Sequence, residues 1–174
     1  MSGELILRCN PTSTVWYDAY DAFRLSLEDG ALATLMTYAP MKEDIRNESR
    51  LEHGTRHTDI SPKLAEREFA IPVHISAKRN AAYVSTNEVG VGYYYQFRNF
   101  LLNGWIDIWV KSLNGGHTAP RAGDIIFRCK YRSCTQFRQT THNNQGIAVF
   151  SLSLVEPNPN NRTLDANGTV NQSY

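Results

Sequence analysis

Apolar residues alternate with polar residues in four stretches of the chain, and each stretch predicts a strand with one buried face. The four stretches are residues 69–76, 105–110, 125–131 and 148–154. A fifth stretch, residues 22–27, alternates in the same way before Asp29 and Gly30 supply a turn. The chain is therefore expected to be rich in β-structure.

One stretch between the first two of these four strands follows the spacing of a helix instead. The apolar face of this helix is formed by Tyr93, Phe97, Phe100 and Leu101. Gly104 follows directly and is a typical helix end, so we expect a helix over residues 93–103. A shorter helix is expected over residues 31–37. Strands on both sides of one principal helix predict an α+β, β-rich fold, either a β-sandwich or a split β-barrel with that α-helix on its flank.

Pro72 lies in the middle of the strand expected over residues 69–76. Proline has no backbone N–H and cannot donate a hydrogen bond to a neighbouring strand. We therefore expect this position at a sheet edge, at a bulge, or with its nitrogen directed away from a partner.

Polar segments interrupt the apolar pattern and set the expected domain organisation. Residues 42–68 have no sustained period, and a connection of this length is uncommon in a compact domain unless something outside the monomer orders it. Residues 136–145 are expected to form a polar connection. We expect one domain over residues 1–157 that carries a long polar arm over residues 42–68. An extended C-terminal tail, rich in Asn, Gly and Thr, should follow over residues 158–174.

The composition suits a globular protein and narrows its partners. Of 174 residues, 41% are hydrophobic and 20% are charged, which argues against general disorder. The 18 basic and 17 acidic residues give a net charge of +1, so no strong field draws the chain to nucleic acid or anionic lipid. The first residues have neither a basic start nor a long apolar run, so we expect no signal peptide or membrane helix.

The three cysteines, Cys9, Cys129 and Cys134, form neither a CxxC pair nor an even set. Reduced thiols are therefore expected. Cys129 falls inside the apolar pattern of a strand, where a thiol packs as a small hydrophobic group.

No motif in the sequence predicts catalysis or a metal site. His53 and His57 have the four-residue spacing of zinc-protease helices, but Gly54 replaces the required glutamate. The sequence contains no G-x-S-x-G, no P-loop and no G-x-G-x-x-G motif. A site assembled from distant residues stays open, but we expect no enzyme activity, no catalytic residues, no metal and no cofactor.

The aromatic residues allow two interpretations. Trp105 and Trp109 share the strand face opposite the aliphatic residues, and leaving such a face exposed would be costly. Coverage by the chain itself or by a neighbouring subunit is favoured over ligand binding. The alternative is a carbohydrate-binding module, in which Trp16, Trp105, Trp109 or the tyrosines at 93–95 would stack on sugar rings.

Six segments carry a resemblance to a known family. They are Arg50-Leu-Glu-His-Gly54, Glu66-Arg-Glu-Phe-Ala-Ile-Pro-Val-His-Ile-Ser76, Tyr94-Tyr-Gln-Phe-Arg-Asn-Phe-Leu-Leu102, Gly104-Trp-Ile-Asp-Ile108, Tyr131-Arg-Ser-Cys-Thr-Gln-Phe137 and Gly146-Ile-Ala-Val-Phe-Ser-Leu-Ser-Leu-Val-Glu-Pro-Asn-Pro159. In this order they resemble small tail proteins of siphophages and prophages, especially tail-tube and distal tail proteins. The resemblance covers most of the chain.

The resemblance implies a structural virion protein that forms a ring at the tail tube or at the distal tail and baseplate hub. Six-fold symmetry is expected, with DNA only passing through the channel. The partners would be copies of this chain and the adjacent tube, tape-measure and baseplate proteins, with no membrane contact. Assembly in the cytoplasm of the host bacterium is expected. A head–tail connector or tail terminator is the alternative within the same class.

A ring requires each subunit to offer two different, complementary surfaces. The candidate contacts between subunits are Arg46, Arg50 and Arg56 in the polar arm, together with Trp105 and Trp109 on the strand face. For the arm, a solvated flexible loop is the alternative.

Overall fold

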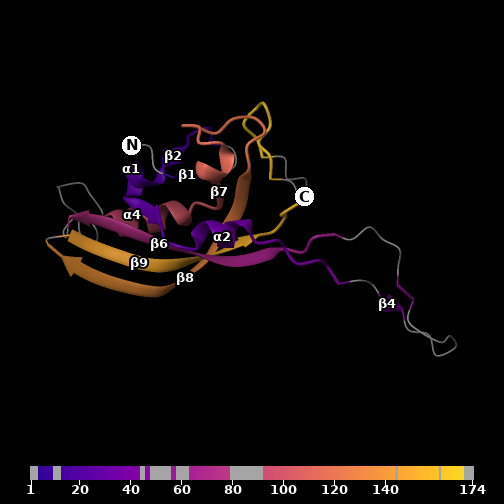
Figure 1. Ribbon diagram of the computed structural model, residues 1–174, viewed down its shortest axis with the longest axis horizontal. Helices are drawn as coiled ribbons and strands as arrows, with labels where there is room; N and C mark the ends of the chain where they lie inside the picture. Colours follow the sequence, from indigo (N-terminus) through magenta and orange to yellow (C-terminus); the bar gives the residue numbers. More distant parts are fainter. Residues whose placement is uncertain are drawn as a thin grey trace.

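The computed structural model describes residues 4–9, 13–43, 46–47, 56–57, 63–78, 92–143, 145–160 and 162–170. Its main element is one seven-stranded antiparallel sheet with the strand order β2-β1-β7-β8-β9-β6-β3 (Figure 1). The strands of this sheet are β1 (Leu5–Cys9), β2 (Tyr17–Asp18), β3 (Leu25–Leu27), β6 (Arg67–Lys78), β7 (Trp105–Val110), β8 (Ile126–His142) and β9 (Gln145–Glu156). A separate pair is formed by β4 (Arg46–Asn47) and β5 (Arg56–His57). The helices are α1 (Ala19–Phe23), α2 (Ala31–Met36), α4 (Tyr93–Leu101) and the 3-10 turn η1 (Ser112–Asn114).

This architecture confirms the expected α+β, β-rich fold and most of its elements. The four alternating stretches correspond to β6, β7, β8 and β9. The residues of the expected helical apolar face lie in α4. The shorter expected helix is α2. No helix within the described ranges is long and apolar enough to cross a membrane.

The strand expected over residues 22–27 is only half correct. Phe23 ends α1, and pairing with β6 begins at Leu25. The cause is a helix cap, because the Asp18 carboxylate accepts hydrogen bonds from the backbone N–H groups of Tyr20 (2.9 Å) and Asp21 (3.2 Å). An aspartate in this position stabilises the first turn of a helix against the extended alternative.

The polar connection expected over residues 136–145 is wrong, because this segment is the outer half of a long hairpin. β8 runs to His142 and pairs with β9, with a register shift between Thr135 and Arg138. Residues 135–140 are all exposed, so neither face of this part of the ribbon is buried. Without a buried face, the alternation that identifies a strand in a sequence is missing.

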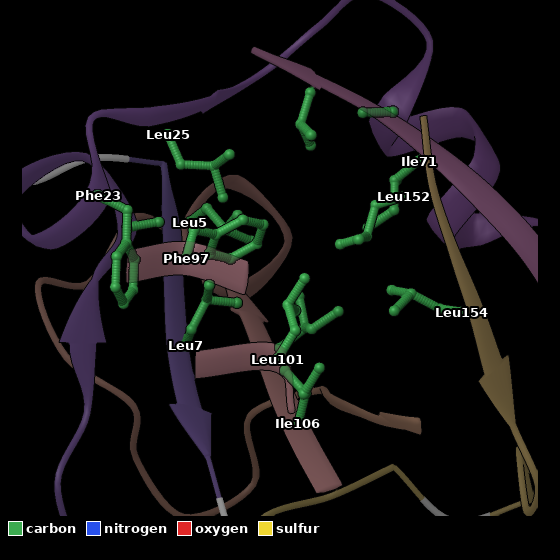
Figure 2. Packing of buried hydrophobic residues seen from close by; sticks show 14 of the residues in the cluster. Leu5, Leu7, Phe23, Leu25, Ile71, Phe97, Leu101, Ile106, Leu152 and Leu154 are labelled. Carbon is green, nitrogen blue, oxygen red and sulfur yellow. The ribbon is translucent and has the colours of Figure 1, made fainter. Parts of the chain in front are cut away.

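The sheet curls around one core, which corresponds to the split-barrel form of the expected fold. Leu5 in β1 and Leu25 in β3 come from strands far apart in the sheet order, yet both line the same small internal space. Figure 2 shows the side chains of these strands converging with Phe97 and Leu101 of α4. The ring of Phe97 also lies 5.4 Å from that of Phe23, so α1 and α4 pack together over the open side of the sheet.

Pro72 satisfies one of the conditions expected for it. The Glu28 N–H donates to the Pro72 carbonyl (3.0 Å), just beyond the end of β3. Both backbone groups of a residue in an antiparallel strand face the same side, so the proline nitrogen faces Glu28 rather than β9. The Glu28 carbonyl already accepts the Ala31 N–H (3.1 Å), and the missing N–H of proline costs no hydrogen bond.

The C-terminal segment differs from the extended tail that was expected, because residues 162–170 pack back onto the sheet. Leu164 and Val170 are buried against Trp109 and Ile126, on the face of the sheet opposite the core. The Ile126 N–H also donates to the Arg162 carbonyl (2.6 Å). Two apolar residues suffice here because they cover an apolar patch that the sheet already presents.

Cys129 is fully buried, and burial raises the pKa of its thiol well above the usual range. Because the thiolate is the reactive form, we expect iodoacetamide to modify Cys129 only after unfolding. Mass spectrometry of protein alkylated in its native and denatured states tests this. The partly buried Cys9 and Cys134 serve as internal references. Equal labelling of Cys129 and Cys134 in the native protein would contradict the packing.

Candidate assembly surface

The described parts of the polar arm lie between α2 and β6 in the chain, and Figure 1 shows β4 away from the sheet. At its base the Lys42 N–H donates to the Lys63 carbonyl (2.8 Å), and the Ala65 N–H donates to the Pro40 carbonyl (2.8 Å). Farther out, β4 and β5 pair antiparallel. The arm is therefore a paired ribbon in its described parts, although its sequence showed no strand period.

Arg67, the first residue of β6, fixes the root of the arm. Its Nη1 donates to the carbonyl oxygens of Leu35 (2.8 Å) and Thr37 (2.6 Å), at the C-terminal end of α2. A guanidinium is favourable at this place because the last carbonyl groups of a helix lack partners within the helix and carry partial negative charge. The outgoing and returning segments of the arm are thereby held together.

The same guanidinium forms a buried ion pair with Glu156, the last residue of β9. Arg67 Nη2 lies 2.8 Å from Glu156 Oε2, with side-chain exposures of 3% and 0%. Arg162 donates two hydrogen bonds to this carboxylate, from Nε to Oε1 (2.6 Å) and from Nη2 to Oε2 (2.8 Å). Burial lowers the pKa of Arg67, and the charge of Glu156 opposes that effect. One buried carboxylate therefore joins the arm root, the last strand and the C-terminal segment.

Four exposed apolar side chains follow α2 into the arm, and we call them the apolar stripe. They are Leu32, Met36, Tyr38 and Met41, with exposed fractions of 36%, 49%, 93% and 54%. Ala31 and Leu35 of the same helix are fully buried, so α2 has apolar residues on both its inner and its outer side. A helix that is apolar all round is normally covered all round.

A groove of about 380 Å³ adjoins the stripe, between β1 and β3, which are not paired with each other. We call it the seam groove. It is lined by Glu4, Leu5, Tyr20, residues 25–30 and Leu32. Leu32 belongs to both features, so the groove adjoins the stripe at this residue. Glu4, Glu28 and Asp29 give the groove three carboxylates, and Glu28 Oε1 lies 2.6 Å from His74 Nδ1.

The three arginines proposed for subunit contacts belong to the arm. Arg46 pairs with His57, and Asn47 pairs with Arg56, so the structure brings Arg46 and Arg56 onto adjacent strands. Arg50 lies outside the described residues. The structure therefore places two of the three in one ribbon and leaves their role as contacts a prediction.

Trp109 was expected to contact a neighbouring subunit, but it is buried within its own chain. Its side chain has no exposed surface, and its Nε1 donates to Asp124 Oδ2 (2.8 Å). Leu164 and Val170 cover it, so the chain itself provides the cover that the sequence required. A buried Trp109 also cannot stack on a sugar.

Trp105 is half-buried, and Lys130 Nζ lies 4.2 Å from the centre of its ring. A cation at this distance over a tryptophan is attracted to the ring face. Trp105 keeps some exposed surface, and its role in subunit contact stays a prediction.

Buried ion pairs that the sequence did not predict lie on the outer face of the sheet. Asp107 in β7 accepts hydrogen bonds from Arg8 (2.6 Å) and Arg128 (2.7 Å) on its two neighbouring strands. All three side chains are almost completely buried. One signal was available, because Asp107 lies between Trp105 and Trp109 on a face that had to be covered, and a covered carboxylate needs cationic partners.

The histidines do not form a ligand set in the described part of the chain. His57 lies in strand β5 rather than on a helix, and His53 lies outside the described residues. Across the described ranges, no group of three or more His, Cys, Asp or Glu side chains is placed to hold a metal ion.

The described parts of the arm, the apolar stripe and the seam groove adjoin one another, and together they form the candidate assembly surface. Its exposed apolar residues adjoin a rigidly held root, and its charged groups line a strand edge. Models of known protein families give no match to this chain, and a comparison with curated proteins gives none either.

Proposed function

We propose that this chain is a structural subunit of a bacteriophage tail, which assembles with copies of itself into a ring around the DNA channel. The resemblance to tail-tube and distal tail proteins, and the β-rich fold with one principal helix, support this proposal. The observation that carries it is the apolar stripe. Tyr38 is 93% exposed, and it lies between Met36 and Met41 on a segment that Arg67 holds in place.

An exposed stripe of this kind is costly for an isolated subunit. Apolar side chains gain about 25 cal/mol for each Å² removed from water, and contiguous exposed apolar surface typically marks an interface. Because Arg67 and Glu156 anchor the root, the backbone that carries the stripe is held before association, and the ordering cost of association comes mainly from the exposed side chains.

The partners in this proposal are other copies of the chain and the adjacent tube, tape-measure and baseplate proteins. The net charge of +1 suits a channel that lets DNA pass without holding it. We propose no catalytic residue and no cofactor. The protein would be assembled in the cytoplasm of the host bacterium and remain in the virion.

Light scattering and negative-stain imaging of the purified chain test the function. We expect rings, with six-fold symmetry from the family resemblance. A chain that remains monomeric at every concentration, and that is absent from purified virions, would contradict the proposal.

Replacing the apolar stripe with serines, in the variant Met36→Ser, Tyr38→Ser and Met41→Ser, is expected to weaken assembly without unfolding the subunit. The three side chains are exposed, so the free energy of unfolding should change by only about 0.5 kcal/mol for each substitution. Sedimentation velocity measures the assembled fraction, and thermal unfolding measures the subunit. Val15→Ser with Leu102→Ser, which removes apolar residues exposed elsewhere, is the control and should assemble normally.

A further inference from the structure

Asparagine is followed by glycine at three places in the chain, Asn103–Gly104, Asn114–Gly115 and Asn167–Gly168. This pair is chemically reactive, because the amide nitrogen of the glycine can attack the side-chain Cγ of the asparagine, and glycine has no side chain to hinder the approach. The attack requires an amide N–H that can lose its proton, a side-chain amide that can turn, and a backbone that can rotate between the two residues. The three places meet these requirements to different extents.

Asn114 in η1 cannot turn its side chain toward the backbone. Its Nδ2 donates to the carbonyls of Val110 (2.9 Å) and Ile125 (3.1 Å), and its Oδ1 accepts the Ile125 N–H (2.7 Å). The residue is only 8% exposed. All three hydrogen bonds have to break together before Asn114 can react, so its reaction should be slowed by at least about a hundred-fold.

Asn167 has an exposed side chain, but the backbone beside it is held. The Gly168 N–H donates to the Asp165 carbonyl (3.1 Å), so the attacking nitrogen is itself in a hydrogen bond. Asp165 Oδ1 accepts the N–H groups of Asn167 (2.8 Å) and Thr169 (2.7 Å), and Arg8 Nη1 donates to the Gly168 carbonyl (2.7 Å). Rotation of the backbone at this place would break several of these bonds, so its reaction should be slowed by about ten-fold.

The Asn103–Gly104 step has neither constraint. Both residues are exposed, and in the described part of the chain the Asn103 side-chain amide and the Gly104 N–H form no hydrogen bond. The last bond at the end of α4 is donated by the Asn103 N–H to the Phe100 carbonyl (3.2 Å), and pairing of β7 with β8 begins at Trp105. Apart from the chain neighbours, no described atom lies within 4 Å of the place that a Cβ would take at Gly104. This link between helix and strand is therefore open on its surroundings.

We propose that Asn103 is a site of spontaneous deamidation in the folded protein, with water as the co-reactant. The Gly104 nitrogen gives its proton to solvent and forms a bond to Asn103 Cγ, while the bond from Cγ to Nδ2 breaks and Nδ2 takes up a proton and leaves as ammonia. Water then opens the succinimide ring at one of its two carbonyl groups, and the ring nitrogen regains its proton. The product is aspartate or isoaspartate, and no oxidant or reductant is needed.

The reaction changes the surface at the C-terminal end of α4. It places a carboxylate there, and the formal net charge of the chain falls by one from +1. A negative charge at this end of a helix is unfavourable, because the last carbonyl groups carry partial negative charge. This inference does not depend on the proposed ring function.

Peptide mapping of the intact chain after incubation at mildly alkaline pH tests the proposal. Trypsin places the three asparagines in separate peptides, residues 99–111, 112–121 and 163–174, so mass spectrometry follows each reaction. In the native protein we expect residue 103 to react about ten-fold faster than residue 167 and at least about a hundred-fold faster than residue 114. In guanidinium chloride the three rates should become similar, because the protecting hydrogen bonds are lost.

Two matched variants identify the source of the acidic product on an ion-exchange column. Asn103→Gln should remove most of the early acidic form, because the longer side chain closes a ring less readily, and Asn167→Gln should retain it. A native rate at residue 103 no higher than at residue 114 or 167 would overturn the proposal, as would an early acidic form that survives Asn103→Gln. Assembly is measured in neither experiment, so such a failure leaves the ring function intact.

Discussion

Replacing Glu156 with glutamine is expected to lower the free energy of unfolding by about 3–5 kcal/mol. The carboxylate has no exposed surface and is contacted by the guanidinium groups of both Arg67 and Arg162. Glutamine keeps the size of the side chain but removes its charge. Two cations would then face each other without the anion that compensates for their removal from water.

Chemical denaturation followed by circular dichroism measures this effect. Glu68→Gln is the matched control, because Glu68 also pairs with an arginine, Arg132, but with side-chain exposures of 53% and 58%. Exposed pairs of this kind contribute less than about 1 kcal/mol. If the two substitutions lowered the free energy of unfolding equally, the buried carboxylate would not have the structural role assigned to it.

The regular part of the fold was predictable because its strands are half-buried. Ile71, Val73 and Ile75 of β6 face the core, and intervening residues such as His74 are more exposed, so burial and sequence follow the same period. The helix α4 was predictable for the same reason, since Phe97, Phe100 and Leu101 are its buried residues.

Segments whose burial depends on distant residues were not predictable. Among the described residues 162–170, only Leu164 and Val170 are buried apolar residues, and their partner Trp109 is far away in sequence. The outer part of β8 has the opposite problem, because it pairs with β9 without any buried face. The contacts of the C-terminal segment are long-range, whereas the outer part of β8 pairs with its neighbour across the hairpin, as in Thr140 with Ile147. Neither arrangement produces an apolar period in the local sequence.

The candidate assembly surface combines features that the sequence showed with features that it did not show. The length and polarity of residues 42–68 indicate an arm, and the role of its arginines as contacts between subunits stays a prediction. The apolar stripe was missed because a helical pattern does not show which apolar residues the rest of the chain leaves uncovered. Leu32 and Leu35 look alike in sequence, yet one is 36% exposed and the other is fully buried.

Trp109→Ala is expected to lower the free energy of unfolding by about 3–5 kcal/mol, as for other large aromatic side chains removed from a packed interior. The indole fills the space between Ile126 and the C-terminal residues Leu164 and Val170, and its N–H is paired with Asp124. Alanine would leave a cavity at this position, and Asp124 Oδ2 would keep only the hydrogen bond that it accepts from the Arg121 N–H (2.9 Å). We also expect faster hydrogen exchange over residues 162–170, because these residues are held partly by the indole.

Trp105→Ala separates this structural role from an effect of tryptophan loss in general. Trp105 is on the same face of β7 but is only half-buried beneath Lys130, so its removal should cost about 1 kcal/mol. Denaturation of the two variants under identical conditions, with hydrogen exchange of the C-terminal segment, compares them directly. If Trp105→Ala lowered the free energy of unfolding much more than Trp109→Ala, the assignment of Trp109 as the tryptophan covered by the C-terminal segment would be wrong. The expected order instead makes Trp109 an internal anchor and leaves Trp105 as the residue of this pair that a neighbouring subunit can reach.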